Sequence, residues 1–328
     1  MANWNAESVL ALSRAFMEPR LLLTGAELNV FTLLAAPQTL DEAVTALGSD
    51  RRGTEILLDG LTAMGLLEKA DGRYLCPAET AAVLSAGAPG SVLPMVLHAA
   101  SVWQRWSELS EVVRRGKKHT PPAGLFENEE LKAFIFAMHV VGRHAADAIA
   151  VCARADASKA LLDVGGATGT YAEAFLRRYP EMRATVFDRA PVIGMAEERL
   201  AGSDVRDRIS LAAGDFYSDP LPGGHDLVLL SAIIHQNSPE QNIALYKKCH
   251  DALAPGGRIL IRDHVMSPDR LRPAGGAIFA VNMLVATEGG NCYTLEEMRE
   301  TLEAAGFRRV ALVQDGERMD GVVEAFKP

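Results

Sequence analysis

Apolar and polar positions follow two different patterns along this chain, and the change falls near residue 155. Before it, apolar residues recur at three- and four-residue spacing, which is typical of amphipathic helices. After about residue 160, short apolar runs alternate with amphipathic stretches, as in a sheet with helices packed on its faces. We therefore expect a mainly helical first half and an α/β second half. The runs expected to form strands are 160–164, 184–187, 227–231, 258–261 and 310–313.

Local signals in the first half predict two helices followed by a small hairpin. Thr39 and Asp50 stand where helix N-caps are expected, and Asp71-Gly72 is a favourable turn between two short strands. Such a unit can read DNA through its second helix, or it can serve as a scaffold or dimerisation module. Only Arg51 and Arg52 are basic at the start of that helix. The second interpretation is therefore favoured over a transcription factor.

Composition excludes several classes of protein. The 328 residues are 48% hydrophobic, so a buried core is expected and general disorder is not. The net charge of −9 argues against nucleic-acid or anionic-lipid partners. No apolar run approaches the ~20 residues of a membrane span, and the first residues lack the features of a secretory signal, so a cytoplasmic protein is expected. The four cysteines show no C-x-x-C spacing, and no metal site is predicted.

The most informative stretch is 163–169, Asp-Val-Gly-Gly-Ala-Thr-Gly, between a predicted strand and a predicted helix. Glycines at Gly165, Gly166 and Gly169 permit a tight turn and let a ligand approach main-chain N–H groups. Asp188 ends the next predicted strand, where a carboxylate can accept hydrogen bonds from both ribose hydroxyls of an adenosine. We therefore expect a nucleotide-like cofactor at this turn.

Two cofactors suit a glycine-rich turn followed by such an acid: a dinucleotide and S-adenosylmethionine. The turn does not match G-x-G-x-x-G, because Ala167 and Thr170 occupy the second and third glycine positions counted from Gly165. Asp163 would repel a pyrophosphate, whereas a sulfonium and an ammonium group are attracted to a carboxylate. Pyrophosphate binding is therefore disfavoured.

A set of motifs then follows in order along the chain: the 163–169 loop, Phe187-Asp188, Gly214-Asp215-Phe216, His235, and Leu-Ala-Pro-Gly-Gly-Arg-Ile at 253–259. Together they resemble the S-adenosylmethionine-dependent O-methyltransferases of the caffeate, hydroxyindole and bacterial polyketide-tailoring type. The resemblance covers essentially the whole chain, since that family also carries an N-terminal winged-helix dimerisation domain.

The resemblance implies an α/β fold: a C-terminal Rossmann-like class I methyltransferase sheet with helices on both faces, preceded by a mainly α winged-helix dimerisation domain. The dimerisation domain would span 1–100, a helical linker contributing to the substrate pocket 101–155, and the cofactor-binding domain 156–328. Two chains would intertwine through the first of these domains, so a homodimer is expected.

For the cofactor, the resemblance implies that the glycine loop lies against the methionine part and that Asp188 holds the ribose. Asp215 and Phe216 would flank the adenine, and Ser231 would lie near the cofactor. His235 corresponds to the general base. Asp263 stands where the family usually has a glutamate that orients the catalytic ring. A phenol has a pKa near ~10 and an imidazole near ~6.5, so proton loss must accompany attack on the methyl group.

Two departures from the family pattern leave alternatives open. His235-Gln236-Asn237 replaces the usual His-Asp-Trp, and Cys292 stands where many members have a second glutamate. Either Asp263 alone supports the histidine, or the base matters less. The first reading is O-methylation of a small aromatic or polyketide-like hydroxyl. The alternatives are C-methylation, or decarboxylation, hydroxylation or pericyclic chemistry with the cofactor retained.

For the acceptor pocket, the only sequence evidence is the spacing of aromatic and methionine residues. Aromatic and methionine side chains that could face a gap between the helical segment and the sheet would sandwich a flat apolar acceptor. Core packing is the alternative interpretation of each. These residues are Trp103, Phe134, Met138, Phe279 and Met283.

Overall fold

The computed structural model describes residues 4–116 and 128–328. The chain divides into two compact units, Met1–Gln104 and Arg105–Pro328. The division falls within helix α7 (Leu93–Trp106). Of the helical linker expected at 101–155, the part from Arg105 onward belongs to the C-terminal unit, and residues 117–127 lie outside the described residues.

The N-terminal unit forms where the local signals predicted it. Thr39 and Asp50 both act as N-caps, each accepting a hydrogen bond from a backbone N–H in the first turn. Asp71 and Gly72 both have positive φ, as the tight turn between β2 and β3 requires. Helices α2 to α6 and a three-stranded sheet of order β1-β3-β2 surround one apolar core, to which α1 contributes no buried residue. The elements are α1 (Ala6–Arg14), α2 (Met17–Glu27), α3 (Val30–Leu33), β1 (Gln38–Thr39), α4 (Leu40–Leu47), α5 (Arg51–Ala63), β2 (Glu68–Ala70), β3 (Arg73–Leu75) and α6 (Ala78–Leu84).

The C-terminal unit is built on a seven-stranded sheet of order β11-β12-β8-β7-β4-β5-β6. The five strands from β8 to β6 are parallel, and β12 and β11 add to the edge in antiparallel fashion. The predicted α/β class is confirmed, and two strands that the sequence analysis did not single out, β6 and β12, complete the sheet. The strands are β4 (Ala160–Val164), β5 (Arg183–Asp188), β6 (Ile209–Ala213), β7 (His225–Ser231), β8 (Leu253–Asp263), β11 (Arg308–Gln314) and β12 (Gly321–Phe326).

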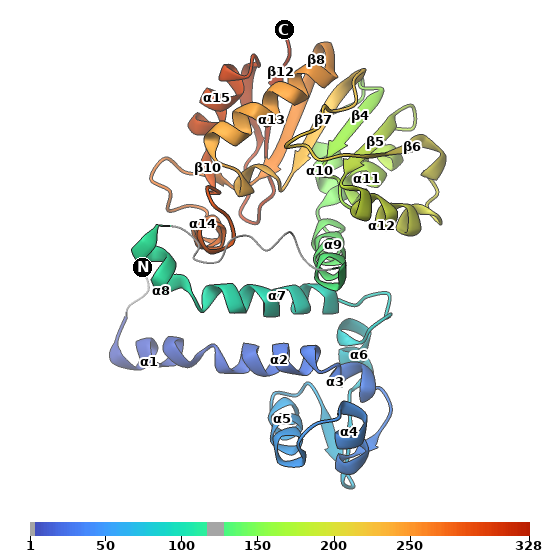
Figure 1. The fold of residues 1–328 in the computed structure, drawn as a ribbon, viewed down its shortest axis with the longest axis vertical. Coiled ribbons are helices and arrows are strands. Elements are labelled where there is room, and N and C mark those ends of the chain that lie inside the picture. Colours follow the sequence, from blue (N-terminus) through green and yellow to red (C-terminus); the bar gives the residue numbers. More distant parts are fainter. Residues whose placement is uncertain (1–3, 117–127) are drawn as a thin grey trace. The chain divides into compact units, whose positions relative to one another are not determined.

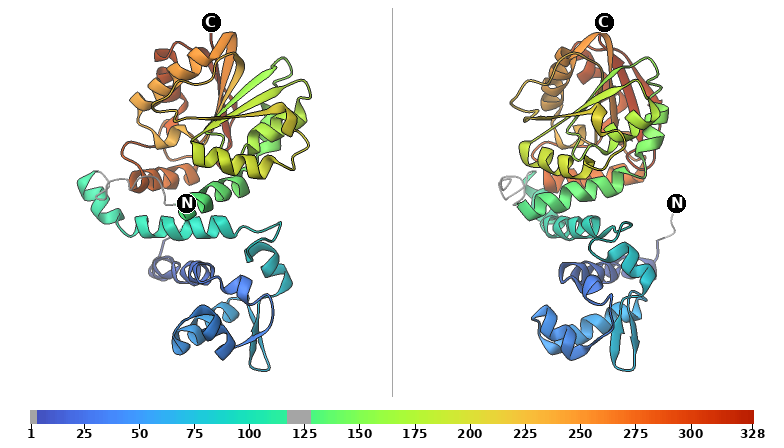
Figure 2. Two further views of the ribbon diagram at one scale, coloured as in Figure 1. Left: turned by 45° about the vertical axis from the view of Figure 1, so that its right-hand side comes forward. Right: turned by 90° about the vertical axis from the view of Figure 1, so that its right-hand side faces the viewer.

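Helices cover both faces of this sheet (Figures 1 and 2). Neighbouring residues of a strand point to opposite faces, so Leu161 and Leu162 belong to different apolar cores. Leu161 shares its core with α10 (Ala146–Cys152), α11 (Thr170–Arg178) and α12 (Ala190–Leu200), and Leu162 shares its core with α13 (Pro239–Ala252) and α15 (Leu295–Ala304). Burial on both faces explains why the central strands are continuous apolar runs.

The strand order creates a switch point beside β4. The chain runs from β4 outward to β5 and β6 on one side, and then returns to β7 and β8 on the other. In open parallel sheets, ligands bind outside the carboxyl ends of the strands at such a point. A ligand site is therefore expected at the segments that follow β4 and β7.

Short elements and three further helices complete the C-terminal unit. The Trp106 indole N–H donates to Oδ1 of Asn282 at 2.9 Å and thereby fastens α14 to the start of this unit. These elements are α8 (Leu109–Arg115), α9 (Asn128–Gly142), η1 (Arg206–Arg208), η2 (Ile234–Gln236), β9 (Val265–Met266), α14 (Ala274–Ala286) and β10 (Tyr293–Thr294). In the part of the chain that the structure describes, no single helix is long and apolar enough to cross a membrane. The bent pair Leu131–Gly142 and Ala146–Cys152 passes that test by length and composition only.

Candidate active site

The glycine loop leaves β4 and turns directly into α11. Gly165 and Gly169 have φ of +67° and +78°, in the region that side chains rarely adopt. A Cβ on Gly165 would lie 2.5 Å from Cδ1 of Ile233, and one on Gly166 would lie 2.8 Å from Oδ2 of Asp163. Because these glycines have no side chains, the loop can pack closely against Ile233 and Asp163, and no Cβ covers its backbone at these positions.

Asp188, at the end of β5, anchors this loop. Its Oδ2 accepts the backbone N–H of Ala167 at 2.9 Å, and its Oδ1 accepts that of Arg189 at 2.8 Å. Burial raises the pKa of Asp188, while these two N–H groups act in the opposite direction. Each oxygen has a further lone pair, so the carboxylate can accept additional hydrogen bonds from a ligand.

Asp163 lies beneath the loop and is 1% exposed. Its Oδ2 has no hydrogen-bond partner among the described residues. Burial raises the pKa of Asp163 to about 7, an effect that the backbone N–H of Ala172 opposes and the charge of Asp188 reinforces. A buried acceptor left unpaired favours a cationic or hydrogen-bonding group at this position.

The loop after β6 approaches the glycine loop from the other side. The backbone N–H of Gly214 donates to the carbonyl of Asp188 at 3.0 Å, and the Phe216 ring comes within 3.5 Å of a Cβ placed on Gly165. Lys248 holds this loop by donating from Nζ to three of its carbonyls, those of Phe216, Tyr217 and Asp219. The structure thus brings the ends of β4, β5 and β6 to one place. Asp215 lies in this loop with its carboxylate bonded to the Tyr217 N–H.

His235 and Asp263 form a buried pair at the ends of β7 and β8. Nδ1 of the ring lies 2.9 Å from Oδ2 and 3.0 Å from Oδ1 of the carboxylate. A carboxylate only accepts, so Nδ1 carries the proton and donates, and Nε2 keeps its lone pair. Phe279 on α14 meets the imidazole edge to face, with ring centroids 4.9 Å apart. The shorter aspartate therefore does reach the ring, and a lone pair capable of taking a proton remains.

Cys292 does not add a second anion to this pair. Burial, reinforced by the charge of Asp263, raises the pKa of the Cys292 thiol to about 12, so the sulfur stays protonated at neutral pH. Within residues 4–116 and 128–328, no group of three metal-ligating side chains comes together. Asp263 is therefore the carboxylate that holds the His235 ring.

Asn237 takes a part that the sequence analysis missed. Its side chain is 0% exposed, accepts the Tyr217 hydroxyl at 2.5 Å through Oδ1, and donates from Nδ2 to Oδ1 of Asn242 at 3.0 Å. The Tyr293 hydroxyl donates to the Asn237 carbonyl. This network joins η2, which carries His235, to the loop after β6. No local sequence signal predicts that an asparagine will be buried. The sequence alone therefore indicated only that Asn237 replaces the tryptophan usual in the family.

Ser231 and the expected pocket residues are spread over several places. Ser231 ends β7 with its Oγ buried and unbonded in the described chain. Phe134 packs between α9 and α12, next to Ala167 of the glycine loop. Met138 is half-buried on α9, and Met283 is buried on α14. Trp103 belongs to the N-terminal unit, where its ring lies 6.0 Å from that of Phe16. Of the five, Phe279 is the residue seen in contact with His235.

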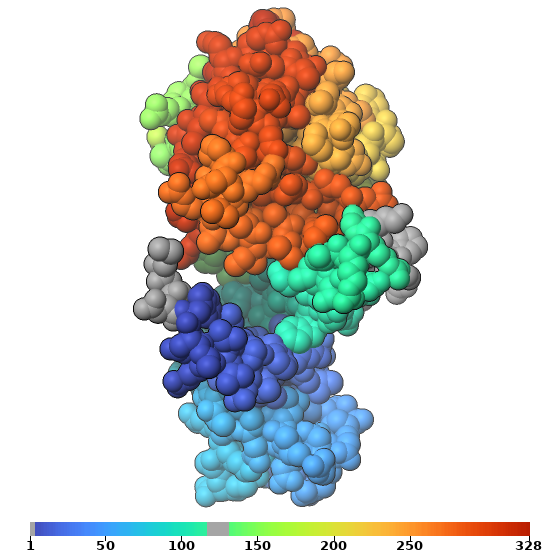
Figure 3. All heavy atoms as spheres, turned by 90° about the vertical axis from the view of Figure 1, so that its left-hand side faces the viewer, coloured from blue at the N-terminus to red at the C-terminus, as the bar shows by residue number. Residues whose placement is uncertain are grey.

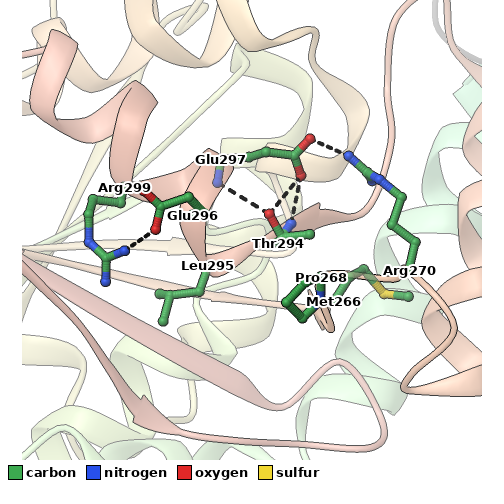
Figure 4. A pocket seen from close by; sticks show the side chains of 8 residues that line it. All are labelled: Met266, Pro268, Arg270, Thr294, Leu295, Glu296, Glu297 and Arg299. Carbon is green, nitrogen blue, oxygen red and sulfur yellow. Dashed lines mark hydrogen bonds and ion pairs between the residues drawn. The ribbon is translucent and has the colours of Figure 1, made fainter.

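A separate hollow of about 570 Å³ opens beside β10 and α15 (Figure 4). Its charged side chains are already paired, Arg270 with Glu297 and Arg299 with Glu296 (Figure 4). None of the residues expected at the site lines it. The hollow therefore presents no free charge to a ligand. Its lining consists of Met266, Pro268, Arg270, Thr294, Leu295, Glu296, Glu297 and Arg299.

Comparisons with known proteins agree with this arrangement. Residues 106–308 match the O-methyltransferase domain model, and residues 10–84 match the O-methyltransferase dimerisation domain model. The chain is 34% identical to 3-hydroxy-5-methyl-1-naphthoate 3-O-methyltransferase of Streptomyces sahachiroi, over 92% of this chain and 90% of that protein. It is 32% identical to the tetracenomycin polyketide synthesis 8-O-methyl transferase of Streptomyces glaucescens, over 92% of this chain and 91% of that one.

Among solved structures, human N-acetylserotonin methyltransferase in complex with S-adenosylmethionine superposes with a TM-score of 0.83. The two are 26% identical, with 100% of this chain and 99% of that chain covered. The family model covers most of the chain, and the naphthoate enzyme is similar over nearly all of it. The chain therefore belongs to the O-methyltransferase family with an N-terminal dimerisation domain, enzymes that transfer a methyl group from S-adenosylmethionine to an oxygen atom.

Proposed function

We propose that this enzyme methylates the hydroxyl of a small aromatic or polyketide-like acceptor, with His235 as the general base. The observation that carries the proposal is the buried pair in which Asp263 holds Nδ1 of His235 at 2.9 Å. The pair fixes the tautomer that leaves Nε2 free to accept a proton. Asp263 is a positioning residue here, because it acts through the ring.

The cofactor site proposed for Gly165, Gly166, Gly169, Asp163 and Asp188 suits an adenosyl sulfonium. Bound S-adenosylmethionine supplies an electrophilic methyl group. The unpaired Oδ2 of Asp163 offers a buried acceptor beneath the bare loop, where a positive charge is stabilised and a pyrophosphate is not. Asp188 has lone pairs for the ribose hydroxyls.

The adenine is assigned to the loop after β6, and a further contact to the end of β7. Phe216 would pack on the face of the base, with Asp215 near its amino group. Ser231 would offer its buried hydroxyl from the end of β7. Lys248 holds this loop through three backbone carbonyls, which supports a preorganised adenine site.

The base works by removing a proton as the acceptor oxygen attacks. A free phenol holds its proton ~3.5 pK units more tightly than an imidazole, about 5 kcal/mol, so complete prior transfer is unfavourable. The carboxylate of Asp263 stabilises the imidazolium that forms as the proton moves to Nε2. Positioning of oxygen, methyl and sulfur in line supplies the rest of the catalysis.

The acceptor is proposed to be flat and apolar because of the side chains around His235. Phe279 packs against the imidazole, and Met283 lies one turn further along α14. Phe134 and Met138 on α9 are proposed to add to the same apolar wall. Trp103 remains a prediction from the sequence. The relatives from Streptomyces are named for a naphthoate and a polyketide, which supports an aromatic acceptor.

We further propose that the enzyme is a homodimer joined through its N-terminal winged-helix unit. No residue of α1 is buried, and Figure 3 shows the segment that forms this helix, in dark blue, at the surface. A run of exposed apolar residues of this kind marks an association surface. The exposed residues are Val9, Leu10, Leu12, Phe16 and Met17.

Transfer of a labelled methyl group tests the reaction directly. The purified enzyme is incubated with S-adenosylmethionine labelled in its methyl group and with a panel of hydroxylated naphthalenes, indoles and anthraquinones. Label is expected in a methyl ether of at least one acceptor. Label on carbon, or consumption of the acceptor without label, would overturn O-methylation of an aromatic hydroxyl.

A further inference from the structure

A second group of polar side chains gathers at the switch point, on the face of the sheet opposite to Asp263. Ser231 and Arg262 are register partners at the ends of β7 and β8, and their side chains lie on the same face. Tyr171, on α11, covers that face. Each of these three residues has a buried polar side-chain atom without a hydrogen bond in the described chain: Oγ of Ser231, Nε of Arg262 and the hydroxyl of Tyr171.

Arg262 is the most unusual member. It is 5% exposed, yet its guanidinium makes no hydrogen bond or ion pair within residues 4–116 and 128–328. It lies over the Tyr171 ring instead, with Cζ 5.5 Å from the ring centroid. Two partly buried arginines of the same unit have partners: Arg199 pairs with Glu173 and Arg258 with Glu324, at 2.9 and 2.8 Å. A buried guanidinium without an anion destabilises the fold that contains it.

No carboxylate in the part of the chain that the structure describes is paired with Arg262. Asp263 points to the other face and holds His235. Asp320 accepts the backbone N–H of Arg318 at 2.8 Å. Oδ2 of Asp163 has no hydrogen-bond partner among the described residues, and burial raises the pKa of this carboxyl to about 7, so it carries only part of a negative charge at neutral pH. The fold therefore supplies no anion for this cation.

The position of the group also points to a ligand. It lies at the carboxyl ends of β7 and β8, on the side of the switch point where ligands of parallel sheets bind. His264, two residues after Arg262, packs its ring 5.4 Å from that of Phe279, and Phe279 in turn meets His235. The chain that carries Arg262 therefore reaches, two residues later, an aromatic ring that contacts the proposed base.

We propose that Arg262, with the hydroxyls of Tyr171 and Ser231, forms a subsite that binds a carboxylate of a ligand. A planar guanidinium matches the two oxygens of a carboxylate, and each hydroxyl supplies one further donor. A dianionic phosphate fits less well, because the single guanidinium supplies only one positive charge. The carboxylate belongs either to the methionine part of the cofactor or to an aromatic acid acceptor. These two candidate ligands are taken from the proposed function, and the subsite proposal rests on the proposed function in this respect alone.

Calorimetry on the full-length enzyme tests the subsite without turnover. One arm compares S-adenosylhomocysteine with its decarboxylated analogue. The other arm compares a hydroxynaphthoic acid with its carboxamide. Here the enzyme is first saturated with S-adenosylhomocysteine or with its decarboxylated analogue, whichever of the two binds more tightly. Arg262→Met removes the charge and keeps an apolar chain of similar length. We expect it to weaken binding of the carboxylate by about 10- to 150-fold in one arm, with little change for the neutral partner. The arm that responds identifies the source.

Two further variants separate a binding role from a structural one. Arg258→Met, on the same strand, breaks the pair with Glu324 and should lower the melting temperature without altering discrimination between acid and neutral ligand. Arg262→Met should melt no lower than wild type, because it removes a charge that has no partner. Tyr171→Phe should reduce the same discrimination by about fivefold.

Discrimination that is unchanged by Arg262→Met in both arms, or a melting temperature that falls as for Arg258→Met, would overturn the subsite. Binding of S-adenosylhomocysteine to wild type, together with methyl transfer, reports separately on the proposed function. If the enzyme binds S-adenosylhomocysteine and transfers methyl groups, but Arg262→Met leaves ligand discrimination unchanged, only the subsite proposal is refuted and the proposed function stands.

Discussion

Replacing Asp163 by Asn should stabilise the enzyme without ligand, and by an amount that depends on pH. Burial raises the pKa of this carboxyl from 3.8 to about 7 in the folded chain. Below the ordinary value both folded and unfolded chains hold the proton, and the group contributes nothing. As the pH rises toward 7, only the unfolded chain releases it, so the folded state loses stability; above about 7 the loss is constant.

The magnitude follows from the size of the pKa rise. A rise of about 3 units corresponds to about 4 kcal/mol of destabilisation at a pH of about 8.5, and about 3 kcal/mol remains at a pH of about 6. Asparagine has no such proton to lose. The free energy of unfolding of Asp163→Asn minus that of wild type should therefore increase by about 1 kcal/mol between these two pH values.

Equilibrium urea unfolding of wild type and variant at several pH values measures this difference. Asp156→Asn, at an exposed position before β4, makes the same change in charge and serves as the control. Its difference from wild type should not vary over this interval. If the Asp163→Asn difference is equally flat, the carboxyl is not held protonated by burial, and the account of the site beneath the glycine loop fails.

Three further outcomes are expected. His235→Ala should lower kcat by about 10²- to 10⁴-fold while calorimetry finds the affinity for S-adenosylhomocysteine unchanged; equal activity would remove the histidine from the mechanism. Tyr217→Phe deletes the hydrogen bond to Asn237, so kcat should fall about fivefold with KM unaltered, and a change confined to KM would contradict a role in holding η2. Leu12→Asp places a charge on a side chain that is 62% exposed on α1, and light scattering should then find half the wild-type mass; an unchanged mass would place the dimer interface elsewhere.

Much of the architecture was predictable from local sequence, because the interactions that produce it are local. The caps at Thr39 and Asp50 and the turn at Asp71-Gly72 depend on residues within a few positions of one another. The apolar periodicity of the second half identified five of the seven strands. β6 was missed because it is only partly buried at a sheet edge, whereas β4, of equal length, is buried almost throughout. β12 lies near the end of the chain, and its burial depends on pairing with β8 and β11.

The pairing of His235 with Asp263 shows what the tertiary structure added. The two residues are 28 positions apart, and the resemblance to a family suggested their relation while leaving the reach of the shorter carboxylate open. Adjacent, parallel β7 and β8 bring their carboxyl ends together, and the distance then closes to 2.9 Å. The network around Asn237 arises in the same way, from segments that meet only after the sheet has formed.

Sequence by itself determined the fold class, the glycine loop and the family, because spacing and backbone freedom are encoded residue by residue. Burial is different, since it depends on what the rest of the chain places around a group. Only the tertiary structure decided that Asp163 holds its proton to about pH 7, that Asn237 is enclosed, and that Arg262 is left without an anion. The free energy of a polar group depends on its solvation and its partners, and those are set by strand order and packing.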